Sequence, residues 1–215
     1  MKIVLIAGAF GSGTSAVAGA LHHMGISTVP PHFHTNDPRT PNSYESQAFR
    51  DIVRSFADEN TLTVDTTKSD LFVQRLKNFL ANVEASRRPP SGDDYPAYIA
   101  LKHPLASICL NEITLAFDPT IILLHRPLEE IEATRIRRGW APQHGAAGAQ
   151  IIYSKARSDL TTLDWEFLRV SFDRFLEEPQ RQLLRILDFC QIRDRTVTSR
   201  IGDALKFVRG KGVRA

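Results

Sequence analysis

The chain has 215 residues, of which 42% are hydrophobic and 24% charged, and its formal net charge is +3. This length and composition predict a single globular domain over residues 1–215. The small positive charge suits an anionic ligand, and without a lysine-rich block carrying interleaved aromatic residues we expect no nucleic-acid partner. No apolar run reaches the roughly 18 residues that span a bilayer, so we expect no transmembrane segment. We expect Cys109 and Cys190, far apart in the sequence, to be buried thiols of a cytoplasmic protein.

The amino-terminal segment predicts an anion-binding loop. The apolar run 3–7 predicts a buried strand, residues 8–15 a glycine-rich turn, and the apolar stretch through Met24 a helix. Such a unit aims backbone N–H groups and the positive end of the helix dipole at a phosphate or sulfate. Its spacing matches G-x-x-x-x-G-K-[ST], except that Thr14 replaces the lysine. A signal peptide is the less favoured interpretation of the same residues. The residues predicted to surround the anion are Gly11, Ser12, Gly13, Thr14 and Ser15.

Short apolar segments alternate with segments of helical spacing along the rest of the chain. The predicted further strands are 26–29, 98–101, 120–124 and 167–171. The predicted further helices are 43–58, 69–84, 105–116, 128–138, 151–160 and 175–189. Strands separated by helices indicate βαβ crossovers, and therefore an α/β fold whose parallel sheet has helices on both faces. Ligands of such sheets bind beyond the carboxyl ends of the strands.

The connecting segments are also predicted. Residues 31–42 are expected to form an irregular, exposed loop, and residues 61–65 an extended segment or a connector. Residues 87–94 predict a surface loop. The glycine–alanine segment 145–148 predicts another loop, within a possible mobile lid over 139–148.

Cations follow two of the predicted strands. Lys102 and His103 come after one, and His125 and Arg126 after another. An enzyme that uses a magnesium–nucleotide complex normally has an acidic metal ligand at such a place. With the loop lysine also missing, we expect Lys102 and Arg126 to neutralise an anion directly, without a metal. The alternative is that both are ordinary solvated strand ends.

Three segments together resemble a known family. The loop at residues 11–15, the Lys-His-Pro at 102–104 and the stretch from Arg126 to Thr134 are similar to the sulfotransferases that use 3′-phosphoadenosine 5′-phosphosulfate, particularly the bacterial branch. The resemblance implies a P-loop nucleoside-triphosphatase-like fold, with the loop holding the 5′-phosphosulfate. It also implies that Arg126 and Thr134, eight residues apart, hold the 3′-phosphate. A looser likeness near the C-terminus adds Arg209 and Lys211 to this set.

One departure from the family bears on catalysis. The family usually has a lysine or arginine directly before Ser-Gly-Thr, where it stabilises charge on the leaving group, and here that position is Gly11. Stabilising this charge is usually the largest catalytic contribution. Either Lys102 takes over this role, or the protein binds the nucleotide with little transfer.

The remaining requirement is a base near the acceptor. His32 and His34 lie in the segment after the predicted second strand, and Glu45 opens the next helix. We expect one of these three to take the acceptor proton, with Asp65 and His103 as weaker candidates. The two histidines alone are too sparse for a metal site, so we expect none.

The sequence therefore predicts a sulfotransferase that moves a sulfuryl group to a hydroxyl or amine of a small-molecule or glycan acceptor. Two alternatives stay open. One is a P-loop small-molecule kinase that uses ATP and Mg²⁺, and the other a catalytically impaired nucleotide-binding protein of the same fold. The acceptor and the oligomeric state are not predicted.

Overall fold

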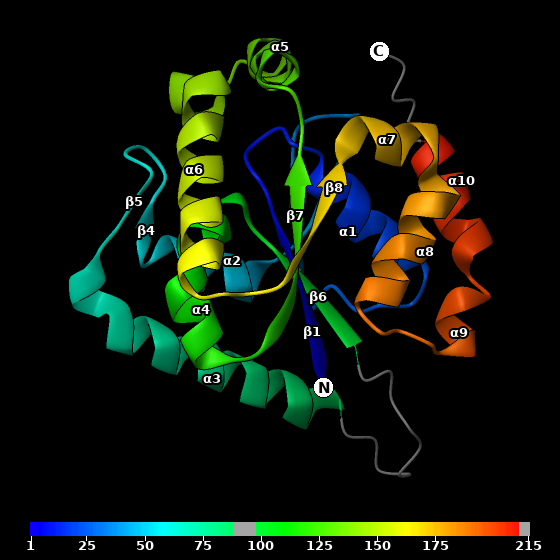
Figure 1. Cartoon of the computed structure of the whole chain (residues 1–215), viewed down its shortest axis with the longest axis horizontal. Coiled ribbons are helices and arrows are strands. Elements are labelled where there is room, and N and C mark those ends of the chain that lie inside the picture. The colour runs from blue at the N-terminus through cyan, green and yellow to red at the C-terminus, as the bar shows by residue number, and fades with distance from the viewer. Residues whose placement is uncertain (88–97, 211–215) are drawn as a thin grey trace.

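The computed structural model describes residues 1–87 and 98–210 and contains a four-stranded parallel sheet (Figure 1). The strand order is β6-β1-β7-β8. Leu5 of β1 pairs with Leu101 of β6 on one side and with Ile121 of β7 on the other. The bounds of these strands are β1 (Lys2–Ala7), β6 (Tyr98–Lys102), β7 (Pro119–His125) and β8 (Phe167–Ser171).

Helices cover both faces of this sheet, with two small hairpins beside it. The hairpin strands are β2 (His32–His34), β3 (Asn42–Ser46), β4 (Ala57–Asp58) and β5 (Thr63–Val64). The α-helices are α1 (Thr14–His23), α2 (Gln47–Arg54), α3 (Ser69–Arg87), α4 (Leu110–Ala116), α5 (Leu128–Arg138), α6 (Ala146–Thr162), α7 (Phe172–Glu177), α8 (Pro179–Phe189), α9 (Arg195–Thr198) and α10 (Ile201–Gly210). Three short 3-10 helices are η1 (Thr66–Lys68), η2 (Pro104–Ile108) and η3 (Pro142–His144).

The sheet separates two hydrophobic cores. Successive strand residues point to opposite faces, so Leu5 packs toward α2, α3, α4 and α6, whereas Val4 and Ile6 pack toward α1, α7, α8 and α10. A strand buried on both faces has a continuous apolar run. This is why the sequence reveals β1 and β7 clearly, and the predicted α/β fold with helices on both faces is confirmed.

The region after α1 differs most from the prediction. Residues 26–29 form no strand but a single parallel bridge, Ser27 to Ile99. The predicted helix over 43–58 is wrong, since β3, α2 and β4 occupy it, and β2 lies within the predicted irregular loop 31–42. The local cause is Asn42, whose Oδ1 accepts the N–H of Tyr44 at 2.9 Å, while Tyr44 has a left-handed φ of 55°. A helix cannot continue through such a residue.

Two other predicted helices are broken. The segment 105–116 divides into η2 and α4 at Cys109, and the segment 175–189 divides at Glu178 because Pro179 follows it. A residue before proline is disfavoured in helical conformation. The predicted loop 145–148 is instead the first turn of α6, and Glu132 accepts the N–H of Ala146 there at 2.9 Å.

The connectors compare as follows. Residues 61–65 contain β5, as the extended alternative predicts. The predicted loop 87–94 lies outside the described residues except for Arg87, which ends α3. Helices α9 and α10 were not among the predicted elements, and α10 packs on α1, where the ring of Phe207 contacts Gly19.

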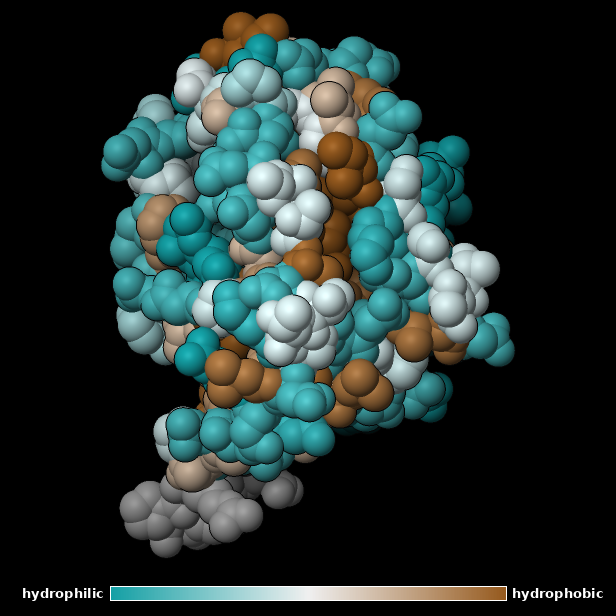
Figure 2. All heavy atoms as spheres, turned by 90° about the vertical axis from the view of Figure 1, so that its left-hand side faces the viewer, coloured by the Kyte–Doolittle hydropathy of each residue, from teal (hydrophilic) through white to brown (hydrophobic). Residues whose placement is uncertain are grey.

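The face of the molecule that carries α3 and α6 is mainly polar (Figure 2). Figure 2 looks onto the side where α3 and α6 lie and shows a short strip of hydrophobic side chains among polar ones. In the described part of the chain, no helix has the length and apolar character needed to cross a membrane. Cys109 and Cys190 are buried free thiols, as expected.

Candidate functional site

The glycine-rich loop joins β1 to α1 at the carboxyl edge of the sheet. Gly11 and Gly13 have φ values of 74° and 92°, which favour glycine, and Gly13 caps the start of α1. The ring of Phe172 lies so close to Gly13 that a Cβ there would be 2.2 Å from it. The loop is thus a tight turn whose amides and helix start form a ready place for an anion.

Ser107 on η2 holds the base of this loop. The Gly8 N–H donates to Ser107 Oγ at 2.8 Å, and Ser107 Oγ donates to the Gly8 carbonyl at 3.2 Å, all in the buried interior. Sequence reasoning missed Ser107. Its signal is weak, a single polar residue within an apolar segment.

Arg126, after β7, reaches the loop from one side. Its Nη1 donates to the carbonyl of Gly11 and to Thr134 Oγ1, each at 3.0 Å. Its Nη2 pairs with Glu130 at 3.2 Å, and its guanidinium lies over the ring of Phe172 at 5.1 Å. The structure therefore brings Arg126 and Thr134 together against the loop, although they are eight residues apart in sequence.

Tyr153 on α6 fixes the backbone beside Arg126. Its hydroxyl accepts the Arg126 N–H at 3.2 Å, and burial raises the pKa of this phenol above its usual value. A neutral hydroxyl thus supports the turn that presents Arg126. Sequence reasoning missed Tyr153 because it lies in the middle of a helix, far from the strand ends.

Lys102, at the end of β6, approaches the loop from the other side. Its Nζ donates to Ser15 Oγ at 3.0 Å and pairs with Glu45 Oε1 at 2.6 Å. The other Glu45 oxygen lies 3.7 Å from Arg50 Nε. Burial alone would raise the pKa of Glu45, but the positive charges, Lys102 above all, lower it overall. Glu45 is therefore a buried carboxylate that holds Lys102 beside the loop.

The predicted histidines lie in different places. His34 is exposed on β2, opposite Asn42 in the hairpin. His32 Nε2 lies 2.7 Å from Thr28 Oγ1, and its Nδ1 lies 3.1 Å from Asn42 Nδ2. Burial lowers the pKa of His32. The hairpin thus uses His32 in its own hydrogen bonding.

His103 is buried next to Lys102. Its Nδ1 accepts the Leu105 N–H at 3.2 Å and so caps η2, and burial lowers its pKa to about 4. His103 is therefore neutral at pH 7, and its acceptor nitrogen is already used. Its place indicates a structural contribution to the turn that carries Lys102.

The C-terminal candidates are less defined. Arg209 is exposed near the end of α10, which runs from α9 toward the end of the molecule where α7 lies (Figure 1). Lys211 lies outside the described residues.

Arg138, at the end of α5, pairs with Asp37 at 2.5 Å and stacks on Trp140 at 4.4 Å. Arg138 thereby fastens the loop between β2 and β3 to α5.

The comparisons with known proteins concern the fold. No protein-family model matches the sequence, and no curated protein matches it either. Among solved structures, one similar chain aligns with 93% of this chain, and the alignment spans 77% of that other chain. The TM-score is 0.54 and the sequence identity is 16%. It is the sulfotransferase domain from the curacin biosynthetic pathway. At this identity the likeness establishes a shared sulfotransferase-type fold and leaves the reaction open.

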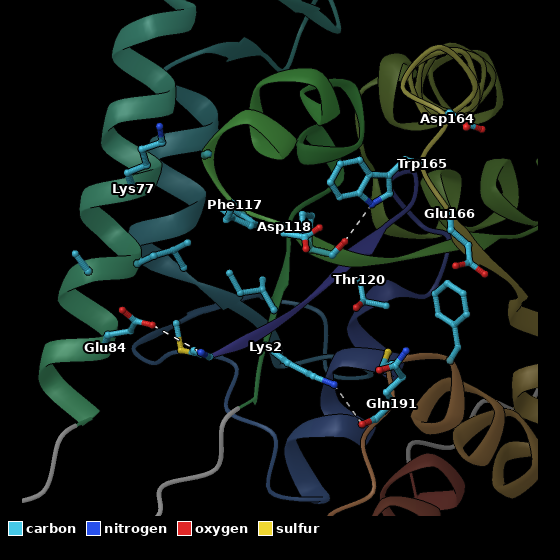
Figure 3. A pocket seen from close by; sticks show the side chains of 18 of the residues that line it. Lys2, Lys77, Glu84, Phe117, Asp118, Thr120, Asp164, Trp165, Glu166 and Gln191 are labelled. Atoms are coloured by element: carbon cyan, nitrogen blue, oxygen red, sulfur yellow. Dashed lines mark hydrogen bonds and ion pairs between the residues drawn. The ribbon is translucent and has the colours of Figure 1, made fainter.

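A surface depression of about 1030 Å³ lies at the opposite edge of the sheet (Figure 3). It is lined by the amino-terminal parts of β1 and β7, including Lys2 and Thr120. Lys2 donates to the Gln191 carbonyl at 3.5 Å, and the N-terminal amine pairs with Glu84 at 3.8 Å. Because ligands of open α/β sheets bind at the carboxyl edge, we place the functional site at the loop and not here.

The described residues contain no cluster of three or more His, Cys, Asp or Glu side chains arranged to hold a metal. At the loop, the hydroxyl that corresponds to the magnesium ligand of G-x-x-x-x-G-K-[ST] belongs to Ser15. This hydroxyl instead accepts a hydrogen bond from Lys102. The arrangement can neutralise an anion with fixed side-chain charges.

Proposed function

We propose that this protein is a sulfotransferase that takes a sulfuryl group from 3′-phosphoadenosine 5′-phosphosulfate and passes it to a hydroxyl or amine. The observation that carries the proposal is the meeting of two cations at one glycine-rich loop, Lys102 on Ser15 and Arg126 on Gly11. A likeness to a sulfotransferase domain over most of the chain supports it at the level of fold.

The residues present fit a doubly charged nucleotide. Amides of the loop and the start of α1 suit the 5′-phosphosulfate, with Lys102 beside them. Arg126 and Thr134 suit a second phosphate. Among the described residues, the Nε of Arg126 is buried without a hydrogen-bond partner. Since an unpartnered buried donor is costly, an incoming phosphate oxygen gives this group the acceptor it lacks.

The proposed reaction is an in-line displacement. The acceptor oxygen or nitrogen attacks sulfur while the bond from sulfur to the bridging oxygen breaks, and adenosine 3′,5′-bisphosphate leaves. Negative charge then grows on the 5′-phosphate, next to the loop amides and Lys102. Preorganised donors at such a place stabilise the transition state by several kcal/mol. We therefore assign to Lys102 the role of the cation that Gly11 lacks.

Calorimetric titration with adenosine 3′,5′-bisphosphate tests this proposal. Replacing Arg126 by alanine is expected to weaken binding by about 2–3 kcal/mol, or about 30- to 150-fold, because a charged hydrogen-bond donor is lost. Arg137→Ala is the matched control, since this arginine lies on α5, the helix that follows Arg126, but pairs with Asp37 at 3.3 Å. The affinity of Arg137→Ala for the bisphosphate should equal that of the wild type.

Three outcomes contradict the proposal. Equal affinity of wild type and Arg126→Ala would remove Arg126 from the site. Stabilisation of the protein by ATP with Mg²⁺, but not by the bisphosphate, would favour a P-loop kinase. Binding of the bisphosphate with no transfer of labelled sulfate to any acceptor would indicate a nucleotide-binding protein that has lost catalysis.

A further inference from the structure

A histidine–glutamate pair lies beside the glycine-rich loop, and the sequence analysis assigns neither of the two residues a role in catalysis or binding. His144 ends η3, and Glu59 lies in the turn between β4 and β5. The two side chains approach to 3.2 Å, between His144 Nε2 and Glu59 Oε1. The His144 ring stacks on Phe10 of the loop, with 4.2 Å between ring centroids and 27° between planes. The pair thus touches the loop itself.

The carboxylate of this pair is firmly held. Glu59 Oε2 pairs with Arg54, and the pKa of Glu59 is lowered, mainly by the neighbouring His144. A second link joins the same two segments, since Gln143 Nε2 donates to Asn60 Oδ1 at 3.2 Å. Only 14% of the His144 side chain and 22% of the Glu59 side chain are exposed. The orientation of the imidazole is therefore fixed.

This orientation leaves one ring nitrogen free to accept a proton. A neutral imidazole has one N–H and one lone pair. His144 Nε2 lies 3.2 Å from a carboxylate oxygen without hydrogen-bond geometry in this rotamer. The negative charge there favours the tautomer with the hydrogen on Nε2, which leaves the lone pair on Nδ1. Among the residues that the structure describes, none is hydrogen-bonded to that Nδ1. A base whose second nitrogen is oriented by a carboxylate is the arrangement that proton transfer requires.

Two other histidines near the site lack a free lone pair. His103 Nδ1 already accepts the Leu105 N–H. His32 Nδ1 faces the amide N–H₂ of Asn42, whose oxygen is itself occupied, so His32 Nε2 is the nitrogen that donates to Thr28. Either ring can take a proton only by giving up a hydrogen bond.

We infer that His144 is the general base of the transfer and that Glu59 is the residue that positions it. This inference rests on the proposed function. As the acceptor oxygen forms its bond to sulfur, its proton passes to His144 Nδ1. The bond from sulfur to the 5′-phosphate breaks, and its electron pair stays on the phosphate oxygen of the departing bisphosphate. Glu59 then stabilises the imidazolium. The Phe10 ring keeps the base against the loop that holds the donor.

The test uses 3′-phosphoadenosine 5′-phosphosulfate labelled with ³⁵S, with water as acceptor, and measures release of labelled inorganic sulfate. His144→Ala is expected to slow release by about 100-fold or more, as for loss of a general base. Its affinity for adenosine 3′,5′-bisphosphate should stay within twofold. Glu59→Gln should slow release less, as a lower kcat with an unchanged KM for the donor, because the imidazolium loses its carboxylate.

One variant serves as the control. Gln143→Ala removes the neighbouring link between the same two segments but leaves the pair intact. It should keep the wild-type rate. If Gln143→Ala slows release as much as His144→Ala, or if His144→Ala keeps its rate, the inference is overturned.

The outcomes also separate this inference from the proposed function. If the wild-type protein binds the bisphosphate but releases no sulfate from the donor, His144 is not a base, and only the nucleotide site stands. If the bisphosphate does not bind at all, the proposed function fails first.

Discussion

Replacing Lys102 by methionine is expected to lower the free energy of unfolding by about 3 kcal/mol. The Lys102 and Glu45 side chains are only 4% and 9% exposed, and the charged atoms are 2.6 Å apart. An exposed pair contributes about 0–1 kcal/mol, whereas breaking a buried pair costs about 3–5 kcal/mol because one charge stays uncompensated. Arg50 Nε still lies 3.7 Å from the Glu45 carboxylate that has lost Lys102, so we expect a loss at the lower end of the range of about 3–5 kcal/mol.

Urea unfolding at pH 7 measures this effect in Lys102→Met, in Glu45→Gln and in the double variant. The double variant should lose much less than the sum of the two single losses, because neither charge is left alone. Lys68→Met is the matched control. Its pair with Asp65 has side chains 53% and 41% exposed, so a change within about 0.5 kcal/mol is expected.

The same variants separate stability from binding. For protein that is still folded, Lys102→Met should weaken binding of adenosine 3′,5′-bisphosphate, since an ammonium beside the loop is lost. Glu45→Gln should weaken binding less, because the glutamine oxygen can still accept a hydrogen bond from Lys102, Ser15 still contacts Lys102, and a negative charge is removed. If the single variants unfold like the wild type, the buried pair does not exist in solution and the reasoning is refuted.

Two further predictions concern the loop and the turn beside it. Gly11→Ala should lower the free energy of unfolding only by the backbone penalty of a positive φ, about 1–2 kcal/mol. Gly13→Ala should lower it by at least about 1–3 kcal/mol more, because the new Cβ overlaps the ring of Phe172. Equal losses of stability in thermal unfolding would contradict this. The pKa of His103 is about 4 in the folded protein and about 6.5 in the unfolded chain. Its contribution to the free energy of unfolding should therefore be fully present above pH 6.5 and fall by roughly 3 kcal/mol as the pH is lowered to 4. His103→Asn, which can still cap η2, should lack this loss in urea unfolding across pH.

The sheet and the loop could be predicted because their signals are local. Strand β1 is apolar at every position from Ile3 to Ala7, and Gly11 and Gly13 of the following turn have φ values that favour glycine. The resemblance to a known family implied that Arg126 and Thr134 act together, and Arg126 Nη1 donates to Thr134 Oγ1 at 3.0 Å. Each of these inferences needs only one stretch of chain.

The hairpin and the helix breaks could be predicted less well. In isolation, residues 43–58 have helical spacing, but one side-chain hydrogen bond from Asn42 to the backbone of Tyr44 selects a strand start instead. Such short polar contacts compete directly with helix formation. In 175–189 the helical periodicity continues across Pro179, although this proline ends one helix and begins the next.

The supporting residues of the site could not be predicted at all. Ser107 meets Gly8 across 99 residues of sequence, and Glu59 meets His144 only because β4 and β5 fold against η3. Neither contact leaves a pattern in either segment. The hydrophobic periodicity of a segment predicts which of its faces is buried, but not which distant element packs against that face.

The position of the cations explains how the loop can lack its own lysine. A lysine at position 11 would need the left-handed φ of 74° that Gly11 adopts, and its carbonyl is the acceptor for Arg126. The loop has no cation of its own. Two cations that follow the neighbouring strands contact it instead, Lys102 after β6 and Arg126 after β7. Since β1 lies between β6 and β7, their carboxyl ends flank the loop on both sides. Under the proposed function, the strand order therefore supplies the positive charge beside the loop through Lys102 and Arg126.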